Sequence, residues 1–232
     1  MTFGVSFFGY AVFEERKKMK ISSKALRLYA VTDRSWLKEN QTLADSVEKA
    51  ILGGVTIVQL REKNTDFEEQ LSLAQELKTV CKKYNVPLII NDSVEIALKS
   101  GADGVHLGQS DGDIKKAREI LGNNAIIGAT AHNVNEAVSA FKSGADYLGC
   151  GAVFGSSTKN NTVPLSFDEL KKICENVSIP VAAIGGINQE NISLLKNTGI
   201  SGVAVVSAIF AENDIQSAAA ALKKSILEIT GD

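Results

Sequence analysis

KSGADGVHLG at Lys99–Gly108 and KSGADYLGCG at Lys142–Gly151 are two copies of one phrase. In each copy a helix-like segment ends in Lys-Ser, the chain turns at a glycine, and an apolar run follows. NTGISGVAVV at Asn197–Val206 is a looser third copy. Such an echo is expected when a barrel grows from duplicated βα units, so the repeat favours a barrel of parallel strands.

The chain from Arg27 onward alternates between short apolar runs and longer segments with a helical pattern. The apolar runs are continuous rather than alternating, which is typical of parallel strands that are covered on both faces. The predicted strands are Leu28–Thr32, Ile57–Leu60, Leu88–Asn91, Gly104–Leu107, Ala125–Ala129, Tyr147–Gly151, Val181–Ile184 and Val203–Val206. Eight βα units in a 232-residue chain predict an α/β protein with a single (β/α)8 TIM barrel, which we place at residues 26–232.

The ends of the predicted helices carry their own signals. Pairs with the spacing of a capping box are Asp66 with Glu69, Asn133 with Glu136, and Ser166 with Glu169. Glycines that suit a left-handed C-cap are Gly53, Gly101, Gly144 and Gly199. A doubly wound open sheet is the alternative fold, but it favours fewer strands and a glycine-rich turn after the first one. Val31-Thr32-Asp33-Arg34 contains no glycine, so the barrel is favoured.

The composition limits the class of protein. Hydrophobic residues make up 44% of the chain, enough for a large core, and the formal net charge of -2 creates no overall field toward nucleic acid or an anionic membrane. No apolar run is long enough to span a bilayer. Cys81, Cys150 and Cys174 form no CxxC pattern, so we interpret them as small buried hydrophobes in a reducing compartment. We expect a soluble, cytoplasmic protein that binds neither nucleic acid nor membrane.

Residues 1–25 are predicted to be an N-terminal extension outside the catalytic domain. Phe3–Phe13 is apolar and aromatic, and the charged run Glu14–Lys18 follows it. A secretory signal places its positive charge before the apolar stretch, so this order argues against one. We expect the extension to be dispensable, with Met19 as a candidate start of the functional protein.

Polar residues and glycines gather where the predicted strands end, and chemistry in such barrels lies at that end. They are Gln59, Arg61 and Lys63 after strand 2, Asn91 and Asp92 after strand 3, His106 and Asp111 in and after strand 4, Thr130 and His132 after strand 5, Gly155–Lys159 after strand 6, Gly185-Gly186 after strand 7, and Ser207 after strand 8. Each alone has an ordinary interpretation as a solvated charge, a helix cap or a tight bend. Because all of them share one rim, the set predicts a functional site.

The residue types at this rim indicate phosphate chemistry. Asp92 and Asp111, on adjacent strand ends beside an amide, suit Mg²⁺, which is commonly held by one or two carboxylates plus substrate phosphates. Arg61, Lys63 and Lys159 supply positive charge for phosphate oxygens. The hydroxyl-rich strand-6 loop and the backbone of Gly185-Gly186 offer a second place for an anion. The pattern predicts two phosphorylated ligands, or one phosphate and one diphosphate.

Seven short motifs together resemble the thiamine phosphate synthase family. They are LYAVTDR at Leu28–Arg34, QLREK at Gln59–Lys63, LIIND at Leu88–Asp92, GVHLGQSD at Gly104–Asp111, STK at Ser157–Lys159, AIGGI at Ala183–Ile187 and VVSAIF at Val205–Phe210. The similarity extends from Leu28 almost to the C-terminus. Any one motif is weak, but seven in order at matching strand ends are specific.

The resemblance implies a transferase that joins an aminopyrimidine diphosphate to a thiazole phosphate. Diphosphate would depart first, and the thiazole nitrogen would capture the pyrimidinylmethyl cation that remains. The implied ligands of the pyrimidine diphosphate are Gln59, Arg61, Lys63, Asn91 and Lys159, of which Arg61, Lys63 and Lys159 would stabilise the departing charge. The implied ligands of the thiazole phosphate are Ser156, Ser157, Thr158, Gly186, Val206 and Ser207. Asp92 and Asp111 would hold Mg²⁺.

The chain departs from the family pattern in two places. The family reads G-V-S-A-H after strand 5, whereas this chain has GATAH, so Thr130 replaces a serine and keeps a hydroxyl that we assign to substrate binding. The family reads G-P-I-F-P-T-x-T-K after strand 6, whereas this chain has GAVFGSSTK, which lacks both prolines but keeps a hydroxyl at Ser156.

Other functions remain as alternatives. A thiazole tautomerase on the same barrel would transfer a proton without metal, and His132 would be its acid or base. A sugar-phosphate isomerase or epimerase needs a carboxylate base that is not committed to metal, and we find no candidate. A non-catalytic sensor would bind the pyrimidine diphosphate without turnover. The diphosphate and Mg²⁺ residues favour the synthase, and a homo-oligomer is compatible with the sequence.

Overall fold

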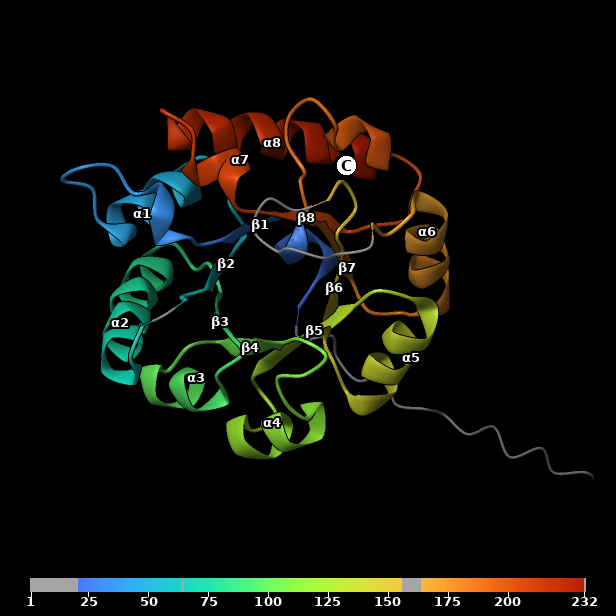
Figure 1. Cartoon of the computed structure of the whole chain (residues 1–232), viewed down its shortest axis with the longest axis horizontal. Helices are drawn as coiled ribbons and strands as arrows, with labels where there is room; N and C mark the ends of the chain where they lie inside the picture. The colour runs from blue at the N-terminus through green and yellow to red at the C-terminus, as the bar shows by residue number, and fades with distance from the viewer. Residues whose placement is uncertain (1–20, 64, 156–163, 232) are drawn as a thin grey trace, which may run out of the picture.

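The computed structural model describes residues 21–63, 65–155 and 164–231. Its parallel strands close into one barrel in which each strand pairs with the next along the chain and β8 returns to β1 (Figure 1). The strands are β1 Leu28–Val31, β2 Ile57–Leu60, β3 Leu88–Asn91, β4 Gly104–Leu107, β5 Ile126–Ala131, β6 Tyr147–Gly151, β7 Val181–Ile184 and β8 Gly202–Val205. The predicted (β/α)8 barrel is confirmed.

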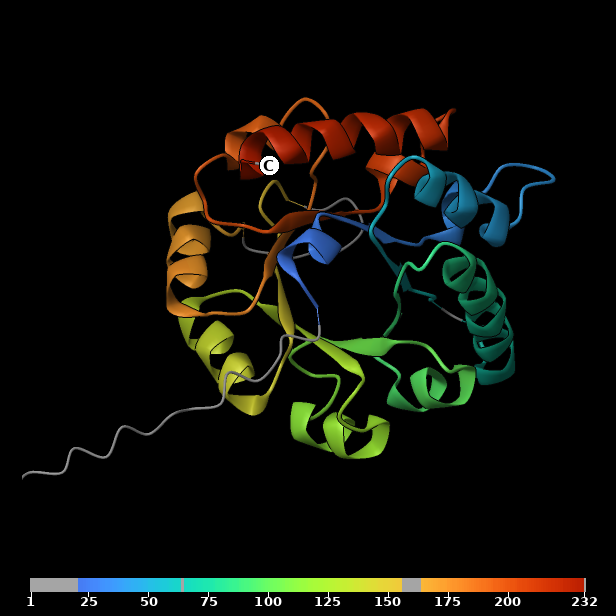
Figure 2. The same cartoon turned by 180° about the vertical axis from the view of Figure 1, so that it is seen from behind.

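Helices surround the strands, as Figures 1 and 2 show from opposite sides. The α-helices are α1 Leu43–Leu52, α2 Phe67–Lys83, α3 Val94–Ser100, α4 Ile114–Leu121, α5 Val134–Ser143, α6 Phe167–Asn176, α7 Ser207–Phe210 and α8 Ile215–Thr230. Short 3-10 helices are η1 Ser23–Leu26, η2 Arg34–Trp36 and η3 Ile192–Leu195. The β7–β8 connection therefore contains the 3-10 helix η3 in the place where the other units carry an α-helix.

The strands are buried on both faces. One cluster of buried side chains, which includes Val58 and Leu148, lies between the strands and the helices, and a second cluster, which includes Tyr29 and Tyr147, fills the barrel. This two-sided burial is why the strands read as continuous apolar runs. Thr130 belongs to β5, because that strand pairs with β6 as far as Ala131, two residues beyond the predicted end.

The amino end of the barrel is closed by residues just before β1. Ile21 is 2% exposed, and both Ile21 and Leu26 belong to the cluster inside the barrel. The helix η1 lies within the ring of strands in both views (Figure 2). The expected extension therefore overlaps the barrel's core at Ile21, while residues 1–20 lie outside the described part of the chain.

The helix starts follow the predicted caps. The side chains of Asp66, Asn133 and Ser166 each accept a hydrogen bond from the backbone N–H three residues later. The glutamates of these pairs serve other contacts. Glu69 accepts a bond from Arg34 at 2.7 Å, Glu136 one from the His132 N–H at 2.8 Å, and Glu169 one from the Val134 N–H at 3.1 Å. They thereby tie each helix to a neighbouring segment.

The glycine predictions hold at most positions. Gly101 and Gly144 are left-handed C-caps with φ of 67° and 98°, and Gly199 has φ of 86°. The prediction is wrong at Gly53, whose φ is -77°; the following Gly54 takes the positive φ instead. A Cβ at Gly53 would lie 2.3 Å from the Gln216 carbonyl oxygen, so close approach of α8 requires that glycine.

The cysteines are free thiols, with Cys81 and Cys150 buried and Cys174 half-buried. Burial raises the pKa of the Cys81 and Cys174 thiols to about 12, so both stay protonated at neutral pH. Across the described residues, no helix combines the length and the apolar character that crossing a membrane requires.

Candidate active site

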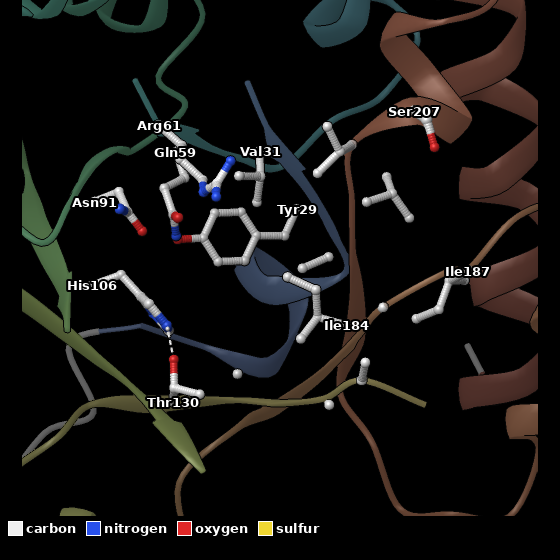
Figure 3. A pocket seen from close by; sticks show the side chains of 18 of the residues that line it. Tyr29, Val31, Gln59, Arg61, Asn91, His106, Thr130, Ile184, Ile187 and Ser207 are labelled. Atoms are coloured by element: carbon white, nitrogen blue, oxygen red, sulfur yellow. Dashed lines mark hydrogen bonds between the residues drawn. The ribbon is translucent and has the colours of Figure 1, made fainter. Parts of the chain in front are cut away.

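A pocket opens at the carboxyl end of the barrel, and its two sides differ in chemistry (Figure 3). The side formed by β1–β5 presents polar side chains: Tyr29, Gln59, Arg61, Asn91, His106 and Thr130. The side formed by β6–β8 presents glycines, small apolar residues and one hydroxyl: Gly149, Gly151, Ala152, Gly185, Gly186, Val206 and Ser207. Hydrogen bonding through side chains is thus concentrated on one side of the mouth.

A second pocket adjoins the first and gathers the predicted charged residues. Arg61, Asn91, His106 and Thr130 line both pockets, so the two share a wall. The second pocket adds Lys63, Asp92 and Asp111, which come from three different strand ends. The structure thus brings Arg61, Lys63 and Asn91, predicted for the diphosphate, together with the two carboxylates predicted for the metal.

Neither carboxylate caps a helix, which removes the ordinary explanation for them. The N-cap of α3 is Ser93, and the N-cap of α4 is Asp113. Asp92 has a left-handed backbone with φ of 64°, and its N–H donates to the His106 carbonyl oxygen at 2.9 Å. A non-glycine residue in this conformation is uncommon, and such residues often cluster at functional sites.

Asp111 is held toward the pocket by its own loop. Its Oδ2 accepts a hydrogen bond from the Gly108 N–H at 3.0 Å, and its Oδ1 accepts one from Ser110 Oγ at 3.2 Å. A Cβ at Gly108 would lie 2.2 Å from Oδ2, so only glycine lets the carboxylate approach this closely. Beside Asp92, Asn91 Nδ2 donates to the carboxylate at 2.5 Å.

This donor set fits a magnesium ion that is shared with a ligand. The described residues contain no group of three or more His, Cys, Asp or Glu side chains that could hold a metal by themselves. Asp92 and Asp111 are both exposed to the pocket. Mg²⁺ is usually bound by one or two carboxylates together with phosphate oxygens and water, so the remaining positions suit a diphosphate.

The two cationic residues of the second pocket, Arg61 and Lys63, flank Glu62 in the sequence. Arg61 is half-buried, and its N–H donates to Thr32 Oγ1 at 3.0 Å, which fixes the start of the loop after β2. The side chain of Glu62 is 3% exposed and pairs with Arg34 at 2.6 Å. Because Arg34 pairs with Glu62, that carboxylate cancels less of the positive charge that Arg61 and Lys63 bring to the pocket.

A continuous chain of hydrogen bonds crosses the barrel beneath the pocket. Gln59 Nε2 donates to Tyr29 Oη at 2.6 Å, and the two tyrosine hydroxyls meet at 2.7 Å. Tyr147 Oη lies 3.1 Å from His106 Nδ1, and His106 Nε2 lies 3.0 Å from Thr130 Oγ1. Neither tyrosine was predicted, because an aromatic residue in a buried strand has the pattern of an ordinary core residue.

The β6–β8 side of the first pocket offers mainly backbone groups for hydrogen bonding. Gly185 and Gly186 both have positive φ, 108° and 64°, and Asn191 Nδ2 holds the Gly186 carbonyl at 2.8 Å. Val206 and Ser207 stand at the start of α7 and line the same pocket. Successive N–H groups in such turns form concavities that favour anions. The predicted Ser156, Ser157, Thr158 and Lys159 lie outside the described residues.

His132, the acid or base of the alternative tautomerase, stands at the edge of the pocket. Its side chain is 47% exposed, and Nδ1 pairs with Glu136 at 2.9 Å. The contact lowers the pKa of the Glu136 carboxyl despite partial burial, so Glu136 is ionised at neutral pH. The pair links the start of α5 to the rim.

Comparison with known proteins agrees with this geometry. The family model described as thiamine monophosphate synthase matches residues 28–209, which include all eight strands of the barrel and the start of α7. The chain belongs to this family. The predicted membership and the predicted enzyme class, a transferase, are both confirmed.

Individual relatives support the family assignment. The thiamine-phosphate synthase of Ruminiclostridium cellulolyticum is 53% identical over 202 residues, which cover 87% of this chain and 94% of the relative. That of Clostridium novyi is 50% identical over 84% of this chain and 96% of the relative. The solved thiamine phosphate pyrophosphorylase of Pyrococcus furiosus is 38% identical, with a TM-score of 0.82, over 90% of this chain and 99% of that one.

More distant structures share the barrel alone. A 3-hexulose-6-phosphate synthase is 18% identical with a TM-score of 0.60, over 86% of this chain and 99% of that one. Close relatives named as synthases favour the synthase over the tautomerase, isomerase and sensor alternatives.

Proposed function

We propose that the protein joins an aminopyrimidine diphosphate to a thiazole phosphate and releases diphosphate, through a dissociative substitution that Mg²⁺ assists. The observation that carries this proposal is the shared wall of the two pockets. A ring bound in the barrel mouth against Gln59 and Thr130 places a diphosphate that it carries beside Arg61, Asp92 and Asp111.

The charges of the second pocket suit a leaving group rather than a nucleophile. Asp92 and Asp111 would hold Mg²⁺, which would supply positive charge for the departing diphosphate. Arg61 and Lys63 bind and orient the same diphosphate, and Asn91 fixes the Asp92 carboxylate. Lys159, the last residue of the Gly155–Lys159 motif after strand 6, would complete this set of positive charges. Preorganised charge of this kind stabilises a transition state in which the carbon–oxygen bond breaks first.

The described residues at the mouth offer no activated nucleophile for a covalent route. Burial raises the pKa of Tyr29 and Tyr147 above the ordinary range, so these hydroxyls remain protonated. None of the three thiols lines either pocket. The cation that diphosphate leaves behind would be captured by the thiazole nitrogen of the second substrate.

The thiazole phosphate would bind on the β6–β8 side of the mouth. Backbone groups at Gly186 and Val206 and the hydroxyl of Ser207 surround that side of the pocket. Ser156, Ser157 and Thr158 would supply further donors to the same phosphate. A backbone site of this kind agrees with the usual phosphate position after strands 7 and 8 of such barrels.

The surroundings of the enzyme are also proposals. Reduced cysteines fit a cytoplasmic protein, and a homo-oligomer is compatible with the fold. Light scattering of the purified chain measures the oligomeric state directly.

Diphosphate release is the decisive assay. We expect release only when the pyrimidine diphosphate, the thiazole phosphate and Mg²⁺ are all present, with thiamine phosphate formed in equal amount. Omission of each component in turn is the control. Isomerisation of a thiazole phosphate tautomer without Mg²⁺, and no release of diphosphate, would instead favour the tautomerase. Binding of the pyrimidine diphosphate without turnover would favour the sensor.

A further inference from the structure

The tyrosines in the hydrogen-bond chain from Gln59 to Thr130 are packed inside the barrel. Tyr29 is 1% exposed and Tyr147 is 0% exposed, and their rings meet edge to face at 5.8 Å between centroids. A Cβ at Gly128 would lie 2.1 Å from Tyr147 Cζ, so the glycine of β5 makes room for this ring. The His106 ring lies 5.5 Å from the Tyr147 ring. Packing therefore fixes the two tyrosine rings and the His106 ring against one another.

Counting the available protons shows which group donates in each of these hydrogen bonds. A neutral tyrosine has one O–H to donate, and burial keeps both phenols neutral. Tyr29 Oη already accepts a bond from Gln59 Nε2, so its own proton goes to Tyr147. Tyr147 must then donate to His106 Nδ1. A neutral His106 that accepts at Nδ1 carries its proton on Nε2 and donates it to Thr130 Oγ1.

The opposite direction leaves a buried donor without a partner. If Tyr147 donated to Tyr29, the Tyr29 proton would need another acceptor, and among the described residues the Tyr29 hydroxyl forms hydrogen bonds with Gln59 and Tyr147 alone. A buried donor that lacks an acceptor lowers the population of that arrangement by a factor of roughly 5–150.

The direction decides what Thr130 can offer to a ligand. Its Oγ1 accepts from His106, and among the described residues no other hydrogen bond involves this hydroxyl. The Thr130 proton is therefore available to the pocket that the side chain lines (Figure 3). If the hydrogen bonds ran in the opposite direction, Thr130 would donate its proton to His106 and could only accept a hydrogen bond from a ligand.

We propose that Tyr29 and Tyr147 are positioning residues that hold His106 as its Nε2–H tautomer and thereby make Thr130 a hydrogen-bond donor to the pyrimidine ring. The identity of the ring rests on the proposed function. The direction of the hydrogen bonds belongs to the protein alone and exists before any substrate binds.

The tautomer of His106 can be measured without substrate. The chain has only two histidines, so a His132→Gln variant assigns the imidazole signals in 15N–1H long-range NMR spectra. At about pH 9, well above the ordinary pKa of imidazole, we expect His106 to carry its proton on Nε2. A proton on Nδ1 would overturn the proposal, whether or not the enzyme releases diphosphate. The proposed function and this inference can thus fail separately.

A matched pair of variants tests the role of each tyrosine. Tyr147→Phe removes the donor to His106, so we expect the Nδ1–H tautomer to appear. Tyr29→Phe removes a similarly buried hydroxyl, but Tyr147 can still donate to His106, so the Nε2–H tautomer should persist. Equal tautomer ratios in the two variants would show that Tyr147 does not act on His106 as proposed. The melting temperatures of both variants measure how much the loss of a buried hydroxyl destabilises the protein.

Kinetics tests whether the tautomer matters for the ligand. Thr130→Val and Tyr147→Phe should each lower kcat/KM for the pyrimidine diphosphate by about tenfold, the scale of one lost hydrogen bond. Because both remove the same donor, the double variant should also lose about tenfold. A loss of about a hundredfold in the double variant would mean that the two residues act independently, and the positioning role would be wrong.

Discussion

The two ends of the barrel are built from opposite kinds of side chain. The carboxyl end presents Arg61, Asp92 and Asp111 to a pocket, and these side chains are half-buried or exposed. The amino end is closed by Ile21 and Leu26, which are almost wholly buried in an apolar cluster. In barrels of this type the carboxyl end carries chemistry and the amino end carries stability. Substitutions at the two ends should therefore separate rate from stability.

The largest effect on rate is expected for the two carboxylates. Asp92→Asn and Asp111→Asn keep the shape of each side chain but remove the charge that would hold Mg²⁺. We expect kcat/KM to fall by about 10³-fold, the upper range for loss of one preorganised charge-stabilising group. The Mg²⁺ concentration for half-maximal activity should rise, while the melting temperature stays close to that of the unmodified chain.

Asp113→Asn is the matched control for these variants. Asp113 lies in the same loop as Asp111 but caps α4, where asparagine caps equally well. Its kinetics should be unchanged. Normal turnover of Asp92→Asn and Asp111→Asn at low Mg²⁺ would refute the metal assignment, and the metal-independent tautomerase would become the leading alternative.

A smaller effect is expected on the backbone side of the same end. Gly186→Ala places a Cβ 2.9 Å from the Phe154 carbonyl oxygen at a residue whose φ is 64°. The turn must shift, so its N–H groups should fit the thiazole phosphate less well. We expect KM for the thiazole phosphate to rise about tenfold, the scale of one charge-assisted hydrogen bond, with little change in KM for the pyrimidine diphosphate.

Gly101→Ala separates backbone strain from loss of the site. Gly101 has φ of 67°, but a Cβ there meets nothing within 4 Å, and the residue caps α3 away from both pockets. Both variants should lose about 1–2 kcal/mol of stability from the left-handed conformation. An equal rise in KM for the two variants would show that the Gly186 turn does not contact the phosphate.

The sequence indicated which described residues lie at the carboxyl end of the barrel, but it did not indicate the contacts inside the barrel, for physical reasons. Charged residues directly after apolar runs, such as Arg61 and Asp92, stand out because a buried strand cannot contain them. Tyr29 and Tyr147 follow the ordinary pattern of a core strand, and their hydroxyls meet across 118 residues of chain. Only closure of the barrel brings them together. Asp92 has a left-handed backbone where its N–H bonds to the His106 carbonyl of β4, a contact that likewise forms only when β3 and β4 pair.

The amino end should show a loss of stability with no loss of rate. Ile21→Ala removes a side chain that is 2% exposed, so we expect the free energy of unfolding to fall by about 2–5 kcal/mol. That corresponds to a fall in melting temperature of roughly 4–20 °C for a chain of this size. The kcat/KM values, measured well below the transition, should stay unchanged. Leu52→Ala, at a residue that is 53% exposed, is the control and should leave both quantities nearly unaltered.

The smallest effect is expected when the chain is shortened to begin at Met19. This variant keeps Ile21 and η1, the residues before β1 that contact the inner cluster. Activity and melting temperature should therefore match those of the full chain, measured by diphosphate release and thermal unfolding. Combining the truncation with Ile21→Ala should reproduce the loss caused by Ile21→Ala alone, because we expect residues 1–18 to add nothing to the closure by Ile21 and Leu26. A large loss from truncation alone would mean that residues 1–18 contribute to the amino end, and the closure would not be the work of Ile21 and η1 only.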